Sequence, residues 1–398
     1  MTSVEGVDVV VVGGGTVGGW AACFLREAGL SVLLLEAGTL GRGASSRAAG
    51  MVRAQGGTEP AVRLGMWSQE FYRGQAERYG VDSGFVATGY YMPCFAEAEV
   101  AAAHERIAMQ NALGLAARWV EPEDVDAGNP AMAPGRTLGA SYFPGDGWID
   151  PPRNVLAYAT VLATSGVQVR ERTSFTGLLT EGGRVTGVQT SRGEVGCTAV
   201  VLTGGPGLAA VGAAAGARRI WSGGTRHQVV VTAAHPDLAP ERLPMVFDVT
   251  SGIYWRPEDG GLLWGMSNPD EPPGEAADFD QGYFALMRAR MAELVPVTAH
   301  LGLRRQWAAT IDYTPDHLPI LGPMLAADGS PVAGAWVAAA GGHGMMWGPG
   351  VSRAAADLAL AGTTSVVDVT DLGMDRFDDS GRSRLAADPI ALPFPQQA

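Results

Sequence analysis

The sequence predicts an α/β protein of two domains, one with a Rossmann-like βαβ unit and the other an α+β domain built on a mixed sheet. At 398 residues the chain exceeds what a single hydrophobic core usually organises. Two short apolar runs, 7–12 and 31–35, flank a helical stretch at 20–27, which is the order of a βαβ unit. Later β-rich segments, between residues 227 and 266, favour a separate sheet.

A glycine-rich turn joins the first apolar run to the helix. Gly13 permits the turn, Gly15 lets the backbone approach a pyrophosphate, and Gly18 lets the helix pack against the strand. The helix N-terminus then presents unsatisfied N–H groups and a positive dipole end to the phosphates. Glu36, at the end of the second run, can accept hydrogen bonds from both ribose hydroxyls. We interpret this unit as a dinucleotide site, with candidate contacts Gly13, Gly15, Thr16, Val17, Gly18, Glu36 and Ala37.

The loop that follows, residues 41–53, distinguishes between two dinucleotides. It is small, hydroxylated and punctuated by Arg, whereas an NAD-binding unit would normally continue directly into another βα repeat. A loop of this composition suits a flavin lying close to the backbone, so FAD is favoured over NAD. The candidate contacts here are Gly43, Ala44, Ser45, Ser46, Arg47, Gly50 and Met51.

The middle of the chain is predicted to form a β-meander that leads back to the nucleotide. Its runs alternate between turns at 181–183 and 191–193, and the last run ends in Gly204 and Gly205. These two glycines, with Phe175 at the start of the meander, are further candidate cofactor contacts. The expected strands of the meander are 167–171, 176–179, 185–190 and 195–201, and the expected helices of the chain are 62–78, 96–115, 155–165, 279–294 and 351–361.

These elements divide into two discontinuous domains and a tail. Residues 1–88, 148–222 and 305–377 are assigned to the FAD-binding domain, and residues 89–147 and 223–304 to the substrate-binding domain. Beyond Phe377 the Asp-, Arg- and Pro-rich sequence is expected to be a loosely packed C-terminal tail, 378–398.

Composition excludes several classes of partner. A net charge of −13 opposes binding to nucleic acid, and no apolar run approaches the roughly 18–20 residues that span a bilayer. The three cysteines lie far apart, so neither a disulfide framework nor a metal site is expected. The N-terminus is acidic, unlike a signal peptide, so a cytoplasmic protein is expected, and the Ala- and Gly-rich composition hints at a bacterium of high GC content. Lysine is absent altogether, so no lysine can act as a base or as a cation beside a cofactor.

Taken together, these motifs resemble the D-amino-acid oxidase-like family of FAD-dependent oxidoreductases, most closely its sarcosine oxidase, dimethylglycine dehydrogenase and glycine oxidase branch. The resemblance spans residues 7–377. It rests on the βαβ unit with Glu36, the segment 43–47, the pairs Asp146-Gly147 and Asp150-Pro151, the return to Gly205, and the segments 314–322 and 342–344.

The resemblance implies how the chain holds its flavin. In such enzymes a late glycine segment opens a helix that points at the flavin pyrimidine ring, which here implies contacts from Gly342, His343, Gly344, Met345 and Met346. Relatives with a covalent flavin use a His in the early loop or a Cys further on, where this chain has Ser45-Ser46-Arg47 and Ala309, so the FAD is expected to be non-covalent. The lysine that activates oxygen in sarcosine oxidase-like members aligns with Leu263. Either another acceptor takes the electrons, or a His or Arg cation serves oxygen, with His227 and His343 as candidates.

The substrate implied is an amine, and most plausibly an amino acid or an N-alkyl or cyclic amino acid, whose C–N bond is oxidised to an imine by hydride transfer to flavin N5. Arg53 matches the position that holds the substrate carboxylate in sarcosine oxidase-like enzymes. Tyr254 and Arg256 lie two apart on a predicted strand and so share a face, which makes them candidates for substrate contact. For His343 the alternative is a turn residue that bonds to the backbone.

Two other functions stay open at this point. One is an FAD-dependent hydroxy-acid or polyol-phosphate dehydrogenase, which would need a base such as His227 or His343. The other is a flavin-binding subunit that requires a partner, so a homo-oligomer or a protein electron acceptor is possible.

Overall fold

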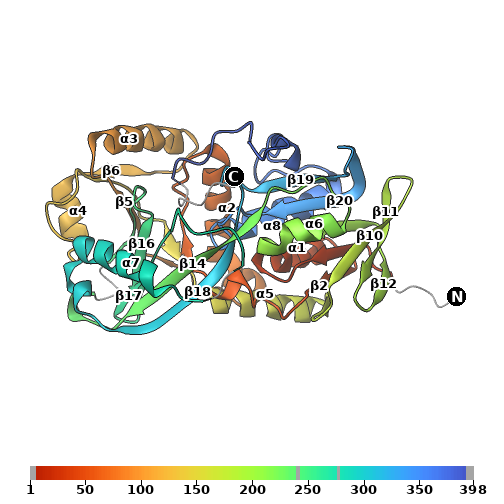
Figure 1. Ribbon diagram of the computed structural model, residues 1–398, viewed down its shortest axis with the longest axis horizontal. Helices are drawn as coiled ribbons and strands as arrows, with labels where there is room; N and C mark the ends of the chain where they lie inside the picture. The colour runs from red at the N-terminus through yellow and green to blue at the C-terminus, as the bar shows by residue number, and fades with distance from the viewer. Residues whose placement is uncertain (1–5, 239–242, 276–277, 391–398) are drawn as a thin grey trace.

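The computed structural model describes residues 6–238, 243–275 and 278–390, and within these it forms two sheet-based halves (Figure 1). One half is built on a nine-stranded sheet whose central strands are parallel. Along the sheet the order is β10 (Phe175–Glu181), β11 (Arg184–Thr190), β20 (Pro331–Ala339), β13 (Ala199–Leu202), β1 (Val9–Val12), β2 (Val32–Leu35) and β9 (Gln168–Arg170), with β12 (Gly193–Gly196) paired to β11 and β19 (Ile320–Leu325) paired to β20.

The central strand of this sheet explains its apolar sequence. Alternate side chains of a strand point to opposite faces, and here both faces are covered. Val9 and Val11 pack in one buried cluster, and Val10 and Val12 in the other. The helices that contact strands of this sheet are α1 (Thr16–Glu27), α5 (Pro151–Ser165), α6 (Leu208–Ala214) and α8 (Gly348–Ala361), whereas α2 (Glu59–Tyr79) packs on α8.

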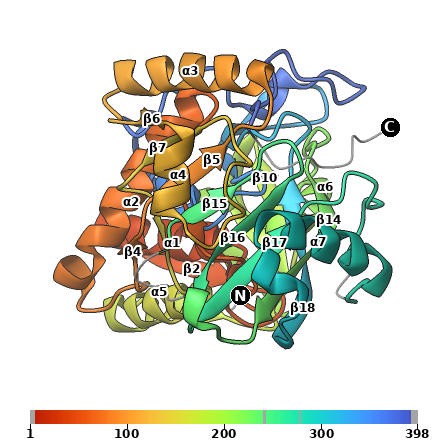
Figure 2. The same cartoon turned by 90° about the vertical axis from the view of Figure 1, so that its left-hand side faces the viewer.

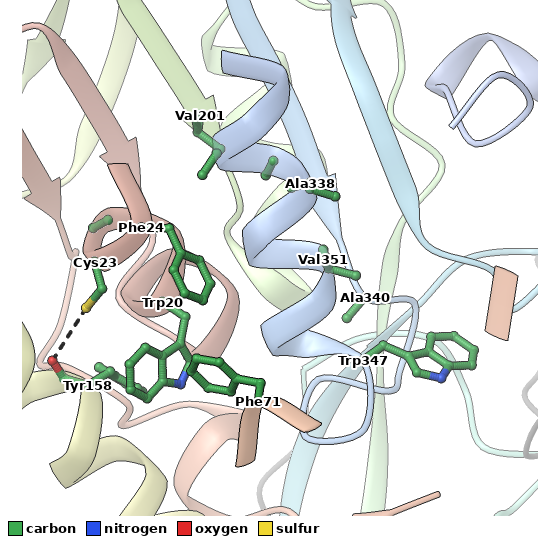
Figure 3. Close-up of a cluster of buried hydrophobic side chains, with 14 of the residues drawn as sticks. Trp20, Cys23, Phe24, Phe71, Tyr158, Val201, Ala338, Ala340, Trp347 and Val351 are labelled. Carbon is green, nitrogen blue, oxygen red and sulfur yellow. Dashed lines mark hydrogen bonds between the residues drawn. The ribbon is translucent and has the colours of Figure 1, made fainter. Parts of the chain in front are cut away.

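An aromatic cluster locks α1 against its neighbours (Figure 3). The Trp20 ring meets Phe71 edge-on at 4.9 Å between ring centroids, and its Nε1–H donates to Asn154 Oδ1 at 3.1 Å. On the same helix Gly19 lies against the Tyr158 ring, where an added Cβ would come within 2.6 Å. The glycines of α1 therefore set the distance between α1 and α5.

The other half is an eight-stranded mixed sheet, which Figure 2 views from its outer end with α3 along the upper edge. Only the β15–β5 pair is parallel among the described pairs of this sheet. The strand order is β18 (Leu303–Tyr313), β14 (Gly223–Thr232), β17 (Gly261–Met266), β16 (Ile253–Glu258), β15 (Met245–Phe247), β5 (Tyr90–Pro93), β7 (Ala140–Phe143) and β6 (Arg118–Val120), with helices α3 (Glu97–Ala112), α4 (Pro122–Gly128) and α7 (Gln281–Leu294).

Short elements complete the fold. A separate three-stranded sheet consists of β3 (Met51–Val52), β8 (Gly147–Trp148) and β4 (Val86–Ala87), in that order of pairing. Five short 3₁₀ turns are described: η1 (Ala44–Ser46), η2 (Gly205–Gly207), η3 (Pro236–Leu238), η5 (Pro296–Ala299) and η6 (Met374–Arg376).

The fold class is as predicted, but several boundaries were wrong. The run 167–171 is not part of the meander, because β9 pairs in parallel with β2. The run 195–201 is two strands, since the chain leaves β12 at Gly196 and enters the parallel sheet only at Ala199. The helix after the glycine turn begins at Thr16 rather than Trp20. The proposed domain boundary at residue 305 falls inside β18, which pairs along its length with β14.

The C-terminal tail differs most from expectation. Asp388 is only 4% exposed and Ile390 is fully buried, so the tail is packed against the fold at these points, while residues 378–380 and 386–387 are exposed. The remainder of the tail, 391–398, lies outside the described residues, as does most of the acidic N-terminus, residues 1–5. The three cysteines are buried and free.

Candidate active site

A cavity of about 440 Å³ runs from the glycine turn after β1 to the face of the eight-stranded sheet. Its wall therefore combines both halves of the molecule. Of the residues that the sequence pointed to, the wall contains Gly13, Gly15, Thr16, Val17, Gly18, Glu36, Ala37, Gly43, Ala44, Ser45, Arg47, Gly50, Met51, Arg53, Phe175, Gly204, Gly205, His227, Tyr254, Gly342, His343, Gly344, Met345 and Met346.

The glycine turn has the geometry that its sequence requires. Gly13 adopts φ +103°, and a Cβ there would come within 2.7 Å of Thr203 Oγ1. At Gly18 a Cβ would lie 1.9 Å from the Gly13 carbonyl oxygen. Gly15 is the N-cap of α1, so the first N–H groups of the helix face the cavity from this turn. The Thr16 N–H donates to Ser45 Oγ at 2.9 Å, which ties the early loop to the helix N-terminus.

Glu36 is fixed at the end of β2. Its carboxylate accepts hydrogen bonds from Gly14 N at 2.7 Å and from Gly38 N at 2.6 Å. Each carboxylate oxygen has a further lone pair, so the group can also accept from ribose hydroxyls. The position and the chemistry both suit an adenosine ribose.

The cavity has the form of a cradle for a large planar ligand. Gly43, Gly205 and Gly344 come from three separate segments, and at each of them an added Cβ would meet no protein atom within 4 Å. Bare backbone therefore faces the cavity from three sides. His343 Nε2 is buried without a hydrogen-bond partner among the described residues. These residues fit FAD, whose pyrophosphate would lie at the glycine turn and whose ring system would lie towards Gly344.

Arg53 is the buried arginine of the cavity wall. It follows β3 and is 3% exposed. Its Nη1 donates to the Gln55 carbonyl and its Nη2 to the Ile390 carbonyl at 3.1 Å, and the guanidinium lies 5.6 Å from the Phe247 ring centroid. A guanidinium has more N–H groups than these two bonds use, so Arg53 can also bind an anion in the cavity.

His227 of β14 and Tyr254 of β16 form a buried pair in the wall of the cavity. The His227 Nε2 and the Tyr254 hydroxyl share a hydrogen bond of 2.6 Å, with the rings 11° from parallel. Burial lowers the pKa of His227 from 6.5 to about 4 and raises the pKa of Tyr254. Both groups are therefore uncharged near neutral pH.

His343 is a turn residue as well as part of the wall. Its Nδ1 lies 3.1 Å from the Gly341 carbonyl, and its ring is 4.0 Å from the Trp347 ring centroid. Burial, reinforced by the positive charge of Arg53, lowers its pKa from 6.5 to about 3. Neither His343 nor His227 is thus a cation at pH 7, which argues against the expectation that one of them supplies positive charge to oxygen.

Two predicted site residues are not in the wall. Ser46 lies in η1, whose other two residues do line the cavity. Arg256 shares the face of Tyr254, but its Nε donates to the Ala49 carbonyl at 2.7 Å and its Nη1 pairs with Glu258 at 2.6 Å. Its guanidinium also stacks 4.5 Å from the Trp148 ring centroid. Arg256 therefore braces the early loop from behind instead of entering the cavity.

The eight-stranded sheet also contributes wall residues that the sequence did not point to. Tyr90, Phe247 and Asp312 line the cavity, although no motif marks them. Burial raises the pKa of Asp312, while backbone N–H groups of Gly341 and Gly342 lower it. Ala309 lies in the wall. Leu263 does not line the cavity and packs in a buried cluster with Val229, so the position that aligns with the lysine of sarcosine oxidase-like enzymes does not reach the cavity.

The part of the chain that the structure describes offers neither a candidate metal cluster nor a helix that could span a bilayer. It contains no group of three or more His, Cys, Asp or Glu side chains that could hold a metal ion. None of its helices is both long and apolar enough to cross a bilayer.

A βαβ glycine turn that shares one cavity with a mixed sheet defines an FAD-dependent oxidoreductase. The model of the family described as FAD dependent oxidoreductase (DAO) matches residues 8–358, so the chain belongs to this family and its cofactor is FAD.

Known proteins of the family resemble the chain over most of its length. It is 29% identical to the 4-methylaminobutanoate oxidase (formaldehyde-forming) of Paenarthrobacter nicotinovorans, over 91% of this chain and 45% of that protein. It is 30% identical to the glycine oxidase of Geobacillus kaustophilus, over 79% of this chain and 84% of that protein. The crystal structure of L-proline dehydrogenase from P. horikoshii superposes with a TM-score of 0.86 at 27% identity, over 94% of this chain and 98% of that one. The chain thus spans less than half of the first relative and most of the second.

Proposed function

We propose that this protein oxidises the C–N bond of an amino acid or an N-alkyl or cyclic amino acid to an imine. The observation that carries the proposal is the position of Arg53, a buried cation in the wall of the cavity that also contains the glycine turn and Glu36. The three relatives described above support the class of substrate, because the names of all three specify an amino acid or a methylamino acid.

Each part of the wall has a distinct task in this proposal. Arg53 would bind the substrate carboxylate through paired N–H donors, which fixes the α-carbon relative to the ring system of the cofactor. Bound FAD would supply the acceptor for the hydride that leaves the α-carbon. Met51, Phe247 and Tyr90 would exclude water from the reacting carbon, since all three are at least nine-tenths buried.

The His227–Tyr254 pair would control the protonation state of the amine. Hydride loss requires a neutral amine nitrogen, and a neutral, desolvated surrounding disfavours the ammonium form. Because both groups are uncharged near pH 7, they can exchange hydrogen bonds with the amine without holding it as a cation.

The acceptor that reoxidises the enzyme is a separate matter. No lysine exists in the chain, and both wall histidines are neutral near pH 7, so the permanent cations of the described wall are Arg42, Arg47 and Arg53, of which Arg53 alone is buried. Reoxidation by a protein partner or by oxygen, a homo-oligomeric state and a cytoplasmic location stay predictions.

The experiment is an anaerobic titration of the FAD-loaded protein with amino acids, N-methyl amino acids, cyclic imino acids and hydroxy acids, followed by admission of air. Bleaching of the flavin absorption by amines alone supports the proposal, and the rate of recovery in air separates an oxidase from a dehydrogenase. Bleaching by hydroxy acids alone would establish the dehydrogenase alternative. If no substrate bleaches the flavin until a second protein is added, the chain is a subunit.

A further inference from the structure

Arg53 is held by two segments that are far apart in the sequence. One is its own strand end, through the Gln55 carbonyl, and the other is the C-terminal segment, through the Ile390 carbonyl at 3.1 Å. Ile390 has no exposed surface and packs in the same buried cluster as Phe247 and Tyr254, which line the cavity. The end of the described chain thus lies directly behind the substrate side of the wall.

The C-terminal segment is anchored at Asp316, in the loop between β18 and β19, before it reaches Arg53. Asp316 forms a buried two-point ion pair with Arg376, at 2.7 and 2.9 Å. The same carboxylate accepts from Ser383 Oγ at 2.6 Å, and the Asp316 carbonyl accepts from Asp388 N at 3.1 Å. Residues 383 and 388 are therefore attached at one point, which fixes where the next two residues can lie.

Asp388 then sets the direction of the Ile390 backbone. Its Oδ1 accepts from Ile390 N at 3.0 Å, which closes a turn that aims the Ile390 carbonyl at Arg53. The side chain fits only because residue 57 is glycine, since a Cβ on Gly57 would lie 2.0 Å from that Oδ1. The charged groups that face Asp388 are Arg53 and Arg106, both of which favour its carboxylate form, while burial opposes it.

We propose that Asp388 and Ile390 are positioning residues for Arg53, and that they make the cavity selective for substrates bearing a carboxylate. The inference rests on the proposed function and extends it to a part of the chain that no site motif includes. A long arginine side chain loses rotamer freedom when it binds an anion, and prior immobilisation by a fixed carbonyl removes much of that cost. With the Ile390 carbonyl on one side and the Gln55 carbonyl on the other, the guanidinium is held against the cavity before substrate arrives.

The test measures equilibrium binding rather than turnover. Acetate, an unreactive carboxylate, is titrated into the FAD-loaded protein while the flavin absorption spectrum is recorded, and acetamide serves as the uncharged comparison. Asp388→Ala should raise the dissociation constant of acetate about tenfold and leave that of acetamide unchanged. Asp388→Asn, which retains an oxygen acceptor for Ile390 N, should bind acetate within about threefold of the unmodified protein.

The same substitution made in an Arg53→Gln protein shows whether Asp388 affects acetate binding through Arg53. In Arg53→Gln, acetate binding should already be weak, and adding Asp388→Ala should change it no further. Unchanged acetate affinity in Asp388→Ala, or an equal loss with and without Arg53, would overturn the inference. If Asp388→Ala failed to retain FAD, Ser383→Ala, which removes only the hydrogen bond from Ser383 Oγ to the Asp316 carboxylate, should weaken acetate binding about threefold, and no change there would also overturn the inference.

The two proposals fail in different ways. If Arg53→Gln binds acetate as well as the unmodified protein does, the assigned role of Arg53 in the proposed function is wrong. If Arg53→Gln loses acetate but Asp388→Ala does not, only the role of the C-terminal segment is wrong.

Discussion

Replacement of Gly18 by alanine should weaken FAD binding and the fold together. A Cβ at this position would lie 1.9 Å from the Gly13 carbonyl oxygen and 2.8 Å from Thr203 Oγ1, whereas ordinary contact begins at 3.4 Å. The close atom at Gly13 is backbone, so relief requires the turn or the helix to move by roughly 1.5 Å, an overpacking that typically costs about 1–3 kcal/mol. Because the displaced turn is the one that faces the cavity, we expect the dissociation constant of FAD to rise by about ten- to a hundredfold.

Gly74→Ala is the matched control for this substitution. Gly74 also lies inside a helix, α2, but an added Cβ would meet nothing within 4 Å. It should stabilise the protein by about 0.5–1 kcal/mol through the higher helix propensity of alanine, with FAD affinity unchanged. Fluorescence titration of the apo-protein with FAD measures the affinity, and urea unfolding measures the stability. Equal FAD affinity and equal stability in Gly18→Ala and the unmodified protein would refute the packing argument.

Three further substitutions test other parts of the account. Arg53→Gln should raise KM for a carboxylated substrate by roughly 30- to 1000-fold, as expected for loss of about 2–4 kcal/mol from a buried charge pair, while an ester of that substrate should be almost unaffected. Arg376→Ala should destabilise the protein by about 3–5 kcal/mol, because it leaves the Asp316 carboxylate buried without its ion-pair partner. Arg384→Ala, which removes an ion pair on the surface, should cost under about 1 kcal/mol. Similar unfolding midpoints for the two variants would contradict this difference. Burial lowers the pKa of His343 from 6.5 to about 3, so its native contribution is complete above about pH 6.5 and is lost as the pH falls towards 3. The free energy of unfolding of His343→Gln, obtained from thermal unfolding, should accordingly fall less steeply between about pH 6.5 and pH 5 than that of the unmodified protein, by up to about 1.4 kcal/mol per pH unit. Parallel pH profiles for the two proteins would show that this histidine is not held neutral.

Local patterns of sequence predicted the cofactor half of the site. β1, the glycine turn and Glu36 belong to one βαβ unit near the start of the chain, and their roles depend on backbone geometry that the residue types dictate. Gly13 needs its positive φ, and Gly18 has no room for a side chain, so the sequence at these positions leaves little choice.

The substrate half depends on contacts that no local pattern encodes. The family resemblance points to Arg53 as a candidate for binding the substrate carboxylate. Its hydrogen-bond partner Ile390 lies 337 residues further on, in a segment whose composition predicts a loose tail. Arg256 and Tyr254 share a strand face, as the period of two predicts, yet only Tyr254 reaches the cavity because Arg256 is drawn to the Ala49 carbonyl and Glu258. Such choices are made by tertiary neighbours, which periodicity cannot identify.

Strand order shows the same limit. β9 has the length and composition of a meander strand, and only its pairing with β2 places it at the edge of the parallel sheet. Sequence periodicity gives the faces of a strand but not its neighbours. The fold class was therefore predictable, whereas the exact domain boundaries were not.

The most direct test of amine oxidation is a comparison of two isotopic forms of one substrate. The best amino acid or N-methyl amino acid from the titration is prepared with hydrogen or deuterium on the α-carbon and, for an N-methyl amino acid, also on the methyl carbon, and the rate of anaerobic flavin bleaching is followed after rapid mixing. Amine oxidation predicts bleaching by both forms, with the deuterated form several-fold slower, because a C–H bond beside the nitrogen breaks as the flavin is reduced. Failure of every amine to bleach the flavin of a correctly loaded protein, while a hydroxy acid does so, would contradict it.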